Sequence, residues 1–105
     1  MPISIFAKQV YELTKLIPKG KVSTYKEISR ALGDSKASRA VGNSLNKNPY
    51  APKVPCHRVI KSNGEVGGFA GGTKKKIIIL NKEGVLINKG KVDLKKYLYE
   101  FKAKR

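Results

Sequence analysis

Three prolines in the middle of the chain, Pro49, Pro52 and Pro55, constrain the fold more than any other feature of the sequence. Proline has no backbone N–H and a fixed φ angle, so this stretch cannot be helical. A second break follows, because five of the nine residues from Gly64 to Gly72 are glycine. The backbone of such a loop can approach another molecule closely. We therefore expect short helices on either side of a central irregular segment.

The residues before the prolines predict three short helices. The first is amphipathic and ends at Pro18, because its apolar residues recur at helical spacing: Ile3, Phe6, Val10, Leu13 and Ile17. Thr24 and Glu27 have the spacing of a capping box and predict a second helix that stops at Gly33. Asp34 or Ser35 is expected to cap a third helix, which carries Ala37, Val41 and Leu45. Two short helices joined by a tight glycine turn are a helix-turn-helix signature.

The residues after the prolines predict less regular structure. Val59-Ile60 reads as a short strand, and a helix is expected from about Thr73 to Glu83. Asp93 is expected to cap a last amphipathic helix with Leu94, Leu98 and Phe101 on one face, solvated and with lysines that attract phosphates. The predicted fold class is mainly α, a winged-helix-like helix-turn-helix domain with minor β content. At 105 residues, one domain over 1–105 is expected.

The charge of the chain points to a polyanionic partner. Lys and Arg number 23 against 7 Asp and Glu, a formal net charge of +16. Neutralisation of phosphates by such a surface supplies sequence-independent affinity. Nucleic acid is favoured over an anionic membrane because the apolar residues are committed to a core; a lysine-rich solubilising surface is the alternative. Without a run of ~20 apolar residues or a signal-peptide pattern, the sequence predicts a cytoplasmic protein with no membrane partner.

The only cysteine and the only histidine are neighbours, Cys56 and His57. One of each excludes a disulfide framework and a Cys/His zinc site, so we expect no metal and no cofactor. A thiol is nucleophilic as the thiolate, and an imidazole can take its proton. Adjacent residues of an extended chain point to opposite faces, so a bridging water could be needed. The alternative is that Cys56 is a small core residue.

The segment Pro55-Cys56-His57-Arg58-Val59 resembles the active-site motif of the O6-alkylguanine-DNA alkyltransferases. The resemblance runs from about residue 3 to 85 and includes Ser38-Arg39-Ala40-Val41-Gly42, Asn48-Pro49 and Val66 to Gly72. It implies a methylated-DNA–protein-cysteine S-methyltransferase that repairs DNA by direct reversal: one irreversible transfer of a methyl or other alkyl group from O6-alkylguanine in duplex DNA to the cysteine. The family's usual N-terminal domain is absent from this chain, and we expect a minimal enzyme that is a monomer.

The same resemblance implies a catalytic role for five residues. Cys56 corresponds to the alkyl acceptor, His57 to the general base acting through a water, and Glu83 to the carboxylate that orients the imidazole. Tyr25 corresponds to the residue that crowds the phosphate of the flipped nucleotide and hydrogen-bonds guanine N3. Asn48 corresponds to the hinge between the DNA-binding helix and the active-site segment.

The DNA-binding and pocket residues are implied in the same way. Arg39 resembles the finger that fills the space of the extruded nucleotide, since a base must leave the stack to react. Ala37 and Gly42, both small, would permit close approach of the recognition helix to the minor groove. The pocket wall would comprise Val59, Phe69, Ala70 and Gly71. Phe69 stands where many members of that family have Tyr, and Ala70 where many have Ser. The resemblance implies that the backbone amide of Ala70 contacts the guanine oxygen.

Two other functions remain open at the level of sequence. The first is an alkyltransferase-like protein that binds lesions without reacting; such relatives usually have Trp at the position of Cys56. The second is a basic winged-helix DNA-binding protein in which Cys56 is only a core residue.

Overall fold

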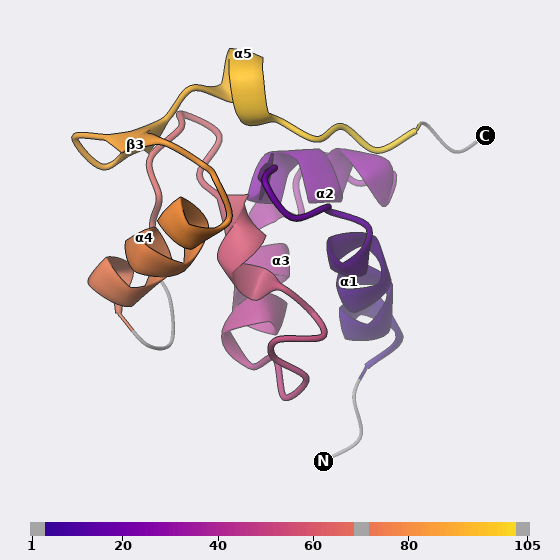
Figure 1. Cartoon of the computed structure of the whole chain (residues 1–105). Helices are drawn as coiled ribbons and strands as arrows, with labels where there is room; N and C mark the ends of the chain where they lie inside the picture. The colour runs from indigo at the N-terminus through magenta and orange to yellow at the C-terminus, as the bar shows by residue number, and fades with distance from the viewer. Residues whose placement is uncertain (1–3, 69–71, 103–105) are drawn as a thin grey trace.

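The computed structural model describes residues 4–68 and 72–102 and confirms a mainly helical fold with short strands. Figure 1 shows the arrangement of these elements. The helices are α1 (Ile5–Lys15), α2 (Tyr25–Ala31), α3 (Ser38–Asn46), α4 (Thr73–Lys82) and α5 (Leu94–Tyr97), with a 3₁₀ turn, η1 (Cys56–Arg58). The strands are β1 (Ser23–Thr24), β2 (Val59–Ile60), β3 (Ile87–Asn88) and β4 (Lys91–Val92).

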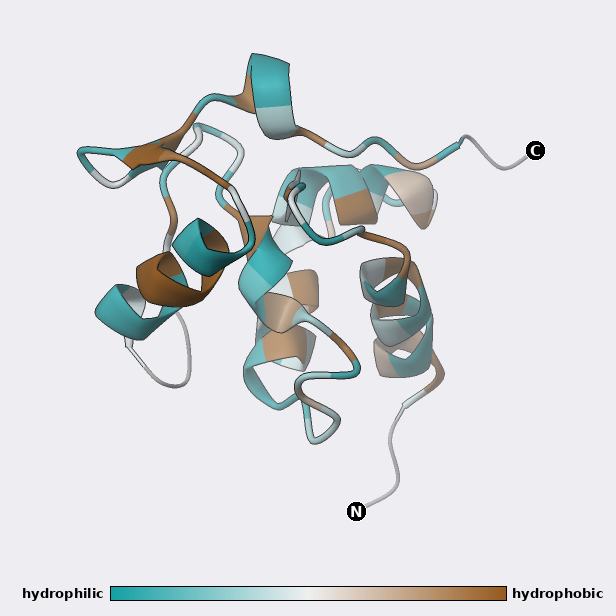
Figure 2. Cartoon of the chain, viewed as in Figure 1, coloured by the Kyte–Doolittle hydropathy of each residue, from teal (hydrophilic) through white to brown (hydrophobic). Residues whose placement is uncertain are grey.

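The core consists of two apolar clusters. One lies between α1, α2, α3 and η1 and includes Val10, Ile28 and Val41. The other lies beneath α4, the β3–β4 hairpin and α5 and includes Leu80 and Val85. Figure 2 shows apolar and polar segments alternating along α3 and α4, as expected of helices that bury one face. No helix among residues 4–68 and 72–102 is long and apolar enough to cross a membrane.

A short parallel pairing connects the two halves of the chain. β1 pairs with β2 in the register Ser23↔Val59 and Thr24↔Ile60. Tyr25 begins α2 directly after β1, and β2 directly follows η1. The pairing therefore brings the first residue of α2 beside the segment that contains Cys56.

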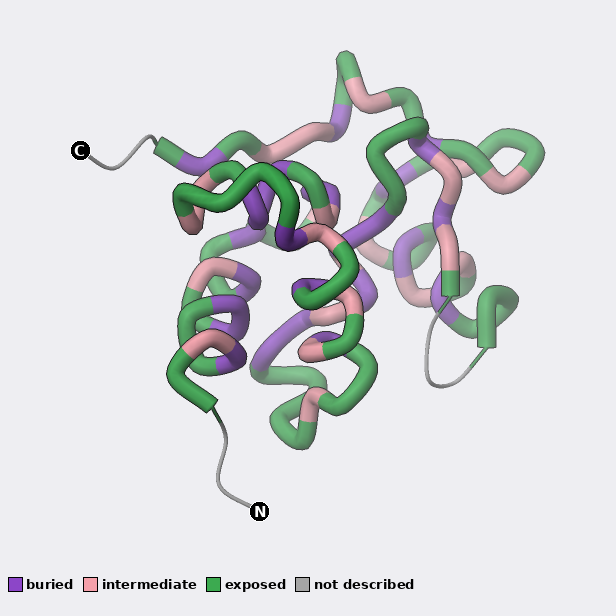
Figure 3. Tube along the Cα trace, turned by 180° about the vertical axis from the view of Figure 1, so that it is seen from behind, coloured by how far each residue is buried: buried purple, intermediate pink, exposed green. Residues whose placement is uncertain are grey.

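The helix-turn-helix pair forms as predicted, except at the start of α3. The Thr24 hydroxyl accepts from the Glu27 N–H (2.9 Å), and Gly33 ends the turn of α2 with φ +85°. Neither Asp34 nor Ser35 caps α3: Ala37 occupies the N-cap position. The Ala37 N–H donates to the Ser29 hydroxyl (3.1 Å) and to the Asp34 carbonyl (3.1 Å), and the Ser29 hydroxyl also donates to that carbonyl. These contacts hold the turn before α3, which begins without a side-chain cap. Figure 3 shows the turn between α2 and α3 exposed at the front of the rear view.

The C-terminal segment differs from the solvated helix that its apolar spacing predicted. Helix α5 is a single turn, and the chain then runs extended to a buried Phe101. The Phe101 N–H donates to Glu27 Oε2 (2.9 Å), and Arg30 donates to both Glu27 and the Phe101 carbonyl (3.0 Å). Backbone bonds with Val22 add to this attachment. These partners satisfy the extended backbone, so it has no need of helical hydrogen bonds.

The attachment of Phe101 to Glu27 predicts a specific loss of stability. Glu27→Ala leaves the buried Phe101 N–H without an acceptor, so the free energy of unfolding should fall by about 2 kcal/mol in denaturant titrations. Hydrogen exchange at the Phe101 amide should accelerate. Glu12→Ala is the control: Glu12 pairs with Lys15 on the exposed face of α1, and its loss should cost less than about 1 kcal/mol. Equal effects of the two substitutions would contradict a structural role for the segment.

Candidate active site and DNA-facing cavity

Cys56 begins a 3₁₀ turn and does not lie on extended chain, contrary to the expectation from the flanking prolines. The Cys56 N–H donates to Val54 O (2.8 Å), and the Arg58 N–H donates to Pro55 O (2.9 Å). A 3₁₀ helix has three residues per turn, so successive side chains point about 120° apart. His57 is buried, at 7 % exposed, whereas Cys56 is half-buried.

Glu83, at the C-cap of α4, binds both residues that follow the cysteine. Its Oε2 lies 3.0 Å from His57 Nε2. Arg58 donates to the same carboxylate twice, from Nε to Oε1 (2.9 Å) and from Nη2 to Oε2 (2.8 Å), and once to the Ile17 carbonyl (2.9 Å). The predicted proximity of His57 and Glu83 is therefore present, and Arg58 is a further member of this cluster that the sequence reasoning had left without a role.

The surroundings of the cluster shift the pKa of both Glu83 and His57 downward, with different consequences for their charge. Burial alone would raise the pKa of the Glu83 carboxyl, but hydrogen bonds from Arg58 and His57 outweigh burial and lower it. Burial lowers the pKa of His57; Glu83 opposes this shift, while the charges of Arg58 and Lys76 reinforce it. At neutral pH, Glu83 is therefore ionised and His57 is a neutral imidazole.

This charge state fixes the histidine tautomer. A carboxylate is only an acceptor, so Nε2 must carry the hydrogen that it shares with Glu83. Nδ1 is then left unprotonated and can accept a proton. In the described part of the chain no hydrogen bond joins the Cys56 thiol to His57. A water that bridges the thiol and the imidazole therefore stays a prediction.

Lys76 is a central residue that the sequence reasoning missed. It is 1 % exposed, and its ammonium donates to the carbonyls of Val59 (2.8 Å) and Gly68 (3.1 Å). It also lies 6.0 Å from the centre of the Tyr25 ring. Burial lowers its pKa to about 8, against the opposing effect of Cys56. A weak sequence signal existed: Lys76 lies four residues before the buried Leu80, on the inner face of α4.

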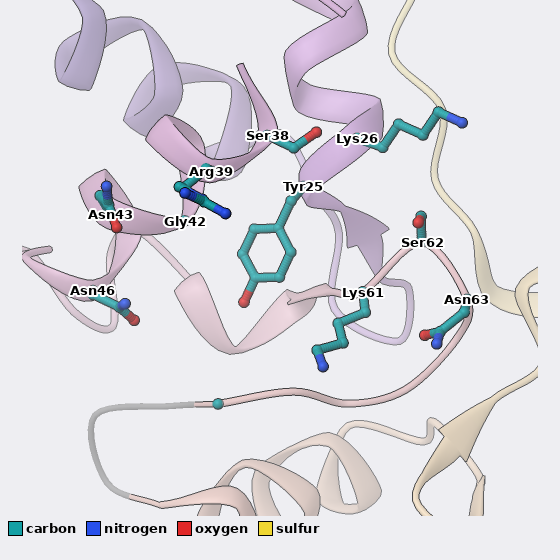
Figure 4. Close-up of a pocket in the computed structure, with 11 residues that line it drawn as sticks. Tyr25, Lys26, Ser38, Arg39, Gly42, Asn43, Asn46, Lys61, Ser62 and Asn63 are labelled. Carbon is teal, nitrogen blue, oxygen red and sulfur yellow. The ribbon is translucent and has the colours of Figure 1, made fainter. Parts of the chain in front are cut away.

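A cavity of about 560 Å³ lies beside this cluster, between α2, α3 and the loop after β2. Figure 4 shows Tyr25 in its centre, with Arg39 on one side and Lys61 on the other. A Cβ at Gly42 would lie 3.9 Å from Cδ1 and Cε1 of the Tyr25 ring, so a larger side chain would crowd it. Burial, and then the charge of Cys56, raise the pKa of Tyr25. Tyr25 therefore connects the cavity with the cysteine, which is not itself among the described residues lining it.

The other predicted site residues have different surroundings. Asn48 donates to Val54 O (2.8 Å) and accepts from Tyr50 N (2.9 Å), so it holds the loop before η1. Val59 is buried, and its carbonyl already accepts from Lys76. Ala37 is buried at the start of α3 and offers little surface to DNA, unlike the exposed Arg39. The predicted pocket residues Phe69, Ala70 and Gly71 lie outside the described residues.

Two further features bear on the choice of site. Among residues 4–68 and 72–102, no three His, Cys, Asp or Glu side chains gather to hold a metal ion.

A larger cavity of about 650 Å³ lies between α1, the end of α2 and the C-terminal segment. Its lining is mostly apolar and includes none of the predicted site residues, so cavity size alone would select a different region from the one that those residues mark.

A helix-turn-helix pair beside a thiol and a buried His-Glu pair is the arrangement of a DNA-alkyltransferase-like domain. The chain belongs to the family of the 6-O-methylguanine DNA methyltransferase, DNA binding domain, whose model matches residues 5–85.

Curated relatives agree with this assignment. A bifunctional methyltransferase/endonuclease of Picrophilus torridus is 43 % identical over 90 residues, which are 86 % of this chain and 30 % of that protein. A methylated-DNA–protein-cysteine methyltransferase of Methanosarcina acetivorans is 49 % identical over 79 residues, or 75 % of this chain and 51 % of that protein. The matched part of the chain thus spans about a third of one relative and about half of the other.

Solved structures include similar proteins bound to DNA. Schizosaccharomyces (S. pombe) Atl1, in complex with damaged DNA containing O6-carboxymethylguanine, has a TM-score of 0.84 and 34 % identity, over 95 % of this chain and 99 % of that one. Mycobacterium tuberculosis OGT in complex with DNA has a TM-score of 0.76 and 37 % identity, over 79 % of this chain and 51 % of that one.

The buried ammonium of Lys76 predicts an unusual dependence of stability on pH. The unfolded chain keeps this proton up to its ordinary pKa of 10.5, and the folded chain only up to about 8. Between these values the unfolded chain binds more protons, so stability rises with pH. Relative to Lys76→Met, the wild-type free energy of unfolding should rise by about 3 kcal/mol across this window. The exposed neighbour provides the control: Lys75→Met should follow the wild-type curve. Parallel curves for wild type and Lys76→Met would disprove the assignment.

Proposed function

We propose that this domain repairs DNA by direct reversal, transferring a methyl or other alkyl group from O6-alkylguanine in duplex DNA to Sγ of Cys56. It would be a methylated-DNA–protein-cysteine S-methyltransferase that acts once. The observation that carries the proposal is the 3.0 Å contact of His57 Nε2 with a Glu83 carboxylate that Arg58 keeps ionised. A neutral imidazole that is held in one tautomer next to a cysteine can act as a general base and remove the thiol proton.

The proposed reaction is a displacement at the alkyl carbon. His57 takes the thiol proton at Nδ1, directly or through a water, and the thiolate attacks. A sulfur–carbon bond forms, the bond between the carbon and guanine O6 breaks, and the guanine keeps its electron pair. The departing guanine gains one proton, with Tyr25 positioned to donate toward N3. The products are an S-alkylcysteine and unmodified guanine, with no oxidant, reductant or cofactor.

Lys76 has two roles in this proposal. The charge of Cys56 opposes the lowering of the Lys76 pKa, so we assign this ammonium an attraction for the thiolate that forms during transfer. Its hydrogen bonds also hold the carbonyls of Val59 and Gly68, which lie on either side of the predicted substrate pocket. The wall residues Phe69, Ala70 and Gly71, and the hinge Asn48, complete the proposed pocket.

The cavity around Tyr25 is the proposed position of DNA. Arg39 projects from the first turn of α3 and would enter the base stack from the minor groove, while Gly42 leaves room for close approach. The damaged nucleotide would flip past Tyr25 toward Cys56. The DNA complexes of Atl1 and of M. tuberculosis OGT support DNA binding by this domain. The β3–β4 hairpin, bridged to Glu65 through Lys91, is the candidate wing. We propose that one monomer carries out both binding and transfer.

A second function is favoured by one finding. Atl1 matches almost the full length of this chain and was crystallised with damaged DNA. A protein that binds lesions without reacting is therefore the alternative, and Cys56 is the residue that distinguishes the two. A basic winged-helix DNA-binding protein would bind duplexes regardless of alkylation.

Intact-protein mass spectrometry tests the transfer. After incubation with a duplex containing O6-methylguanine, the wild-type protein should gain the mass of one methylene group, located on the Cys56 peptide. Cys56→Ala should bind the same duplex and gain nothing. Tight binding by the wild type without an adduct would establish the lesion-binding alternative. Removal of the lesion by Cys56→Ala would eliminate Cys56 as the acceptor.

Kinetics test the proposed base. His57→Gln and Glu83→Gln should slow single-turnover transfer on the order of 10²-fold or more, with lesion binding retained and Glu12→Gln as the control. Because burial lowers the pKa of His57, the wild-type rate should persist down to about pH 6.5 and fall only below it. Glu83 raises that pKa, so the decline in Glu83→Gln should move to lower pH. Equal pH profiles in the two proteins would contradict this coupling.

A further inference from the structure

A basic surface lies where three segments of the chain meet: the loop between α1 and β1, the end of α4, and α5. The Lys21 ammonium donates to the Lys96 carbonyl (3.2 Å), which joins the loop to α5. A Cβ at Gly20 would lie 3.3 Å from the Glu83 carbonyl oxygen, which places the same loop against the end of α4. The three segments therefore form one continuous surface.

Each segment exposes lysine, and we call the resulting surface the basic face: Lys19, Lys21, Lys82 and Lys96. None of these four forms a salt bridge with any described residue. The adjacent carboxylates are engaged elsewhere, because Glu83 is turned inward to Arg58 and His57, and Asp93 accepts from the Lys95 N–H at the start of α5. The three adjoining segments therefore carry four exposed lysines that no described carboxylate pairs with, and such a surface attracts polyanions.

Two of the three segments of the basic face, the end of α4 and the loop between α1 and β1, lie on the other side of the helix-turn-helix pair from the DNA-facing cavity, and α5 lies at the top edge (Figure 1). In Figure 1 the end of α4 and the loop leading from α1 to β1 lie toward the viewer, in front of α2 and α3. The rear view in Figure 3 brings the turn between α2 and α3 to the front, together with the loop after β2. The cavity is lined by these rear elements. A straight duplex held at the cavity therefore leaves the end of α4 and the loop between α1 and β1 free.

We propose that the basic face binds a second segment of duplex DNA through its phosphates, so that the protein can pass directly from one segment to another. Lysine ammonium groups are compact point charges that suit phosphate contacts without reading sequence. The four residues include no aromatic side chain, and the Tyr97 ring lies buried under the Lys96 ammonium at 5.4 Å. Bases of a single strand would need exposed rings on which to stack, so the duplex backbone is the better match. The inference rests on the proposed function only in that the first segment occupies the cavity.

Direct transfer has a kinetic signature. The protein is bound to a fluorescent, lesion-free duplex, and its dissociation is followed at increasing concentrations of unlabelled duplex. For the wild type, the dissociation rate should rise with competitor concentration, because a second segment binds before the first leaves. The variant K19Q/K21Q/K82Q/K96Q should lose this dependence while still binding the first duplex.

A matched variant separates position from total charge. K8Q/K47Q/K53Q/K89Q removes the same four charges from other exposed segments and should retain the competitor dependence. If the first variant is unstable, K19Q/K82Q/K96Q keeps the Lys21 hydrogen bond and should show a partial loss. Retention of the dependence in the basic-face variants, its loss in both sets, or its absence from the wild type would overturn the proposal.

Two further outcomes are informative. Binding of anionic phospholipid vesicles that depends on the four lysines, without competitor-dependent dissociation from DNA, would assign the surface to a membrane and overturn the proposal. Competitor-dependent dissociation by a protein that forms no adduct with an O6-methylguanine duplex would support the second DNA surface while refuting the proposed alkyl transfer. Absence of any duplex binding would overturn both.

Discussion

The carboxylate of Glu83 is the interaction on which the rest of the site depends. It accepts two hydrogen bonds from Arg58 and a third from His57, and Arg58 also donates to the Ile17 carbonyl. The end of α4, the 3₁₀ turn and the end of the first helical segment are thereby tied to one point. A buried carboxylate is tolerated only when its partners satisfy it. The orientation of the imidazole and the packing of α4 against the 3₁₀ turn consequently depend on the same carboxylate.

Lys76 provides a second buried charge, of opposite sign, that also connects separate segments of the chain. Its ammonium donates hydrogen bonds to one carbonyl in β2 and one in the glycine-rich loop, and it lies near the Tyr25 ring. The parallel pairing of β1 with β2 brings that ring into place. Cys56 itself packs against the first apolar cluster, and its segment is joined to a buried anion through His57 and Arg58 and to a buried cation through Val59. Both charges come from the same helix, α4, which carries no predicted contact with DNA.

The sequence predicted those features that depend on neighbouring residues. The capping residue Thr24, the stop at Gly33 and the strand at Val59 all follow from local chemistry. The pairing of His57 with Glu83 came from resemblance, since the two are 26 residues apart. Tertiary contacts decided the rest. The hydroxyl of Ser29 holds the turn before α3, which has no side-chain cap, and Phe101 leaves the helical path because Glu27 and Arg30 bind its backbone. Burial of Lys76 was hidden within a run of three lysines.

Cys56 differs from its neighbours in one respect that affects how this family can change. His57, Arg58, Glu83 and Lys76 each hold other parts of the fold through hydrogen bonds, whereas among the described residues the thiol holds none. Mutational drift at the first four positions therefore carries a folding cost as well as a chemical one. At position 56 the cost is one of chemistry and of packing against the core, without any side-chain hydrogen bond to replace. Under the proposed function, a single substitution there would remove the alkyl acceptor and leave the hydrogen bonds of the other four residues in place.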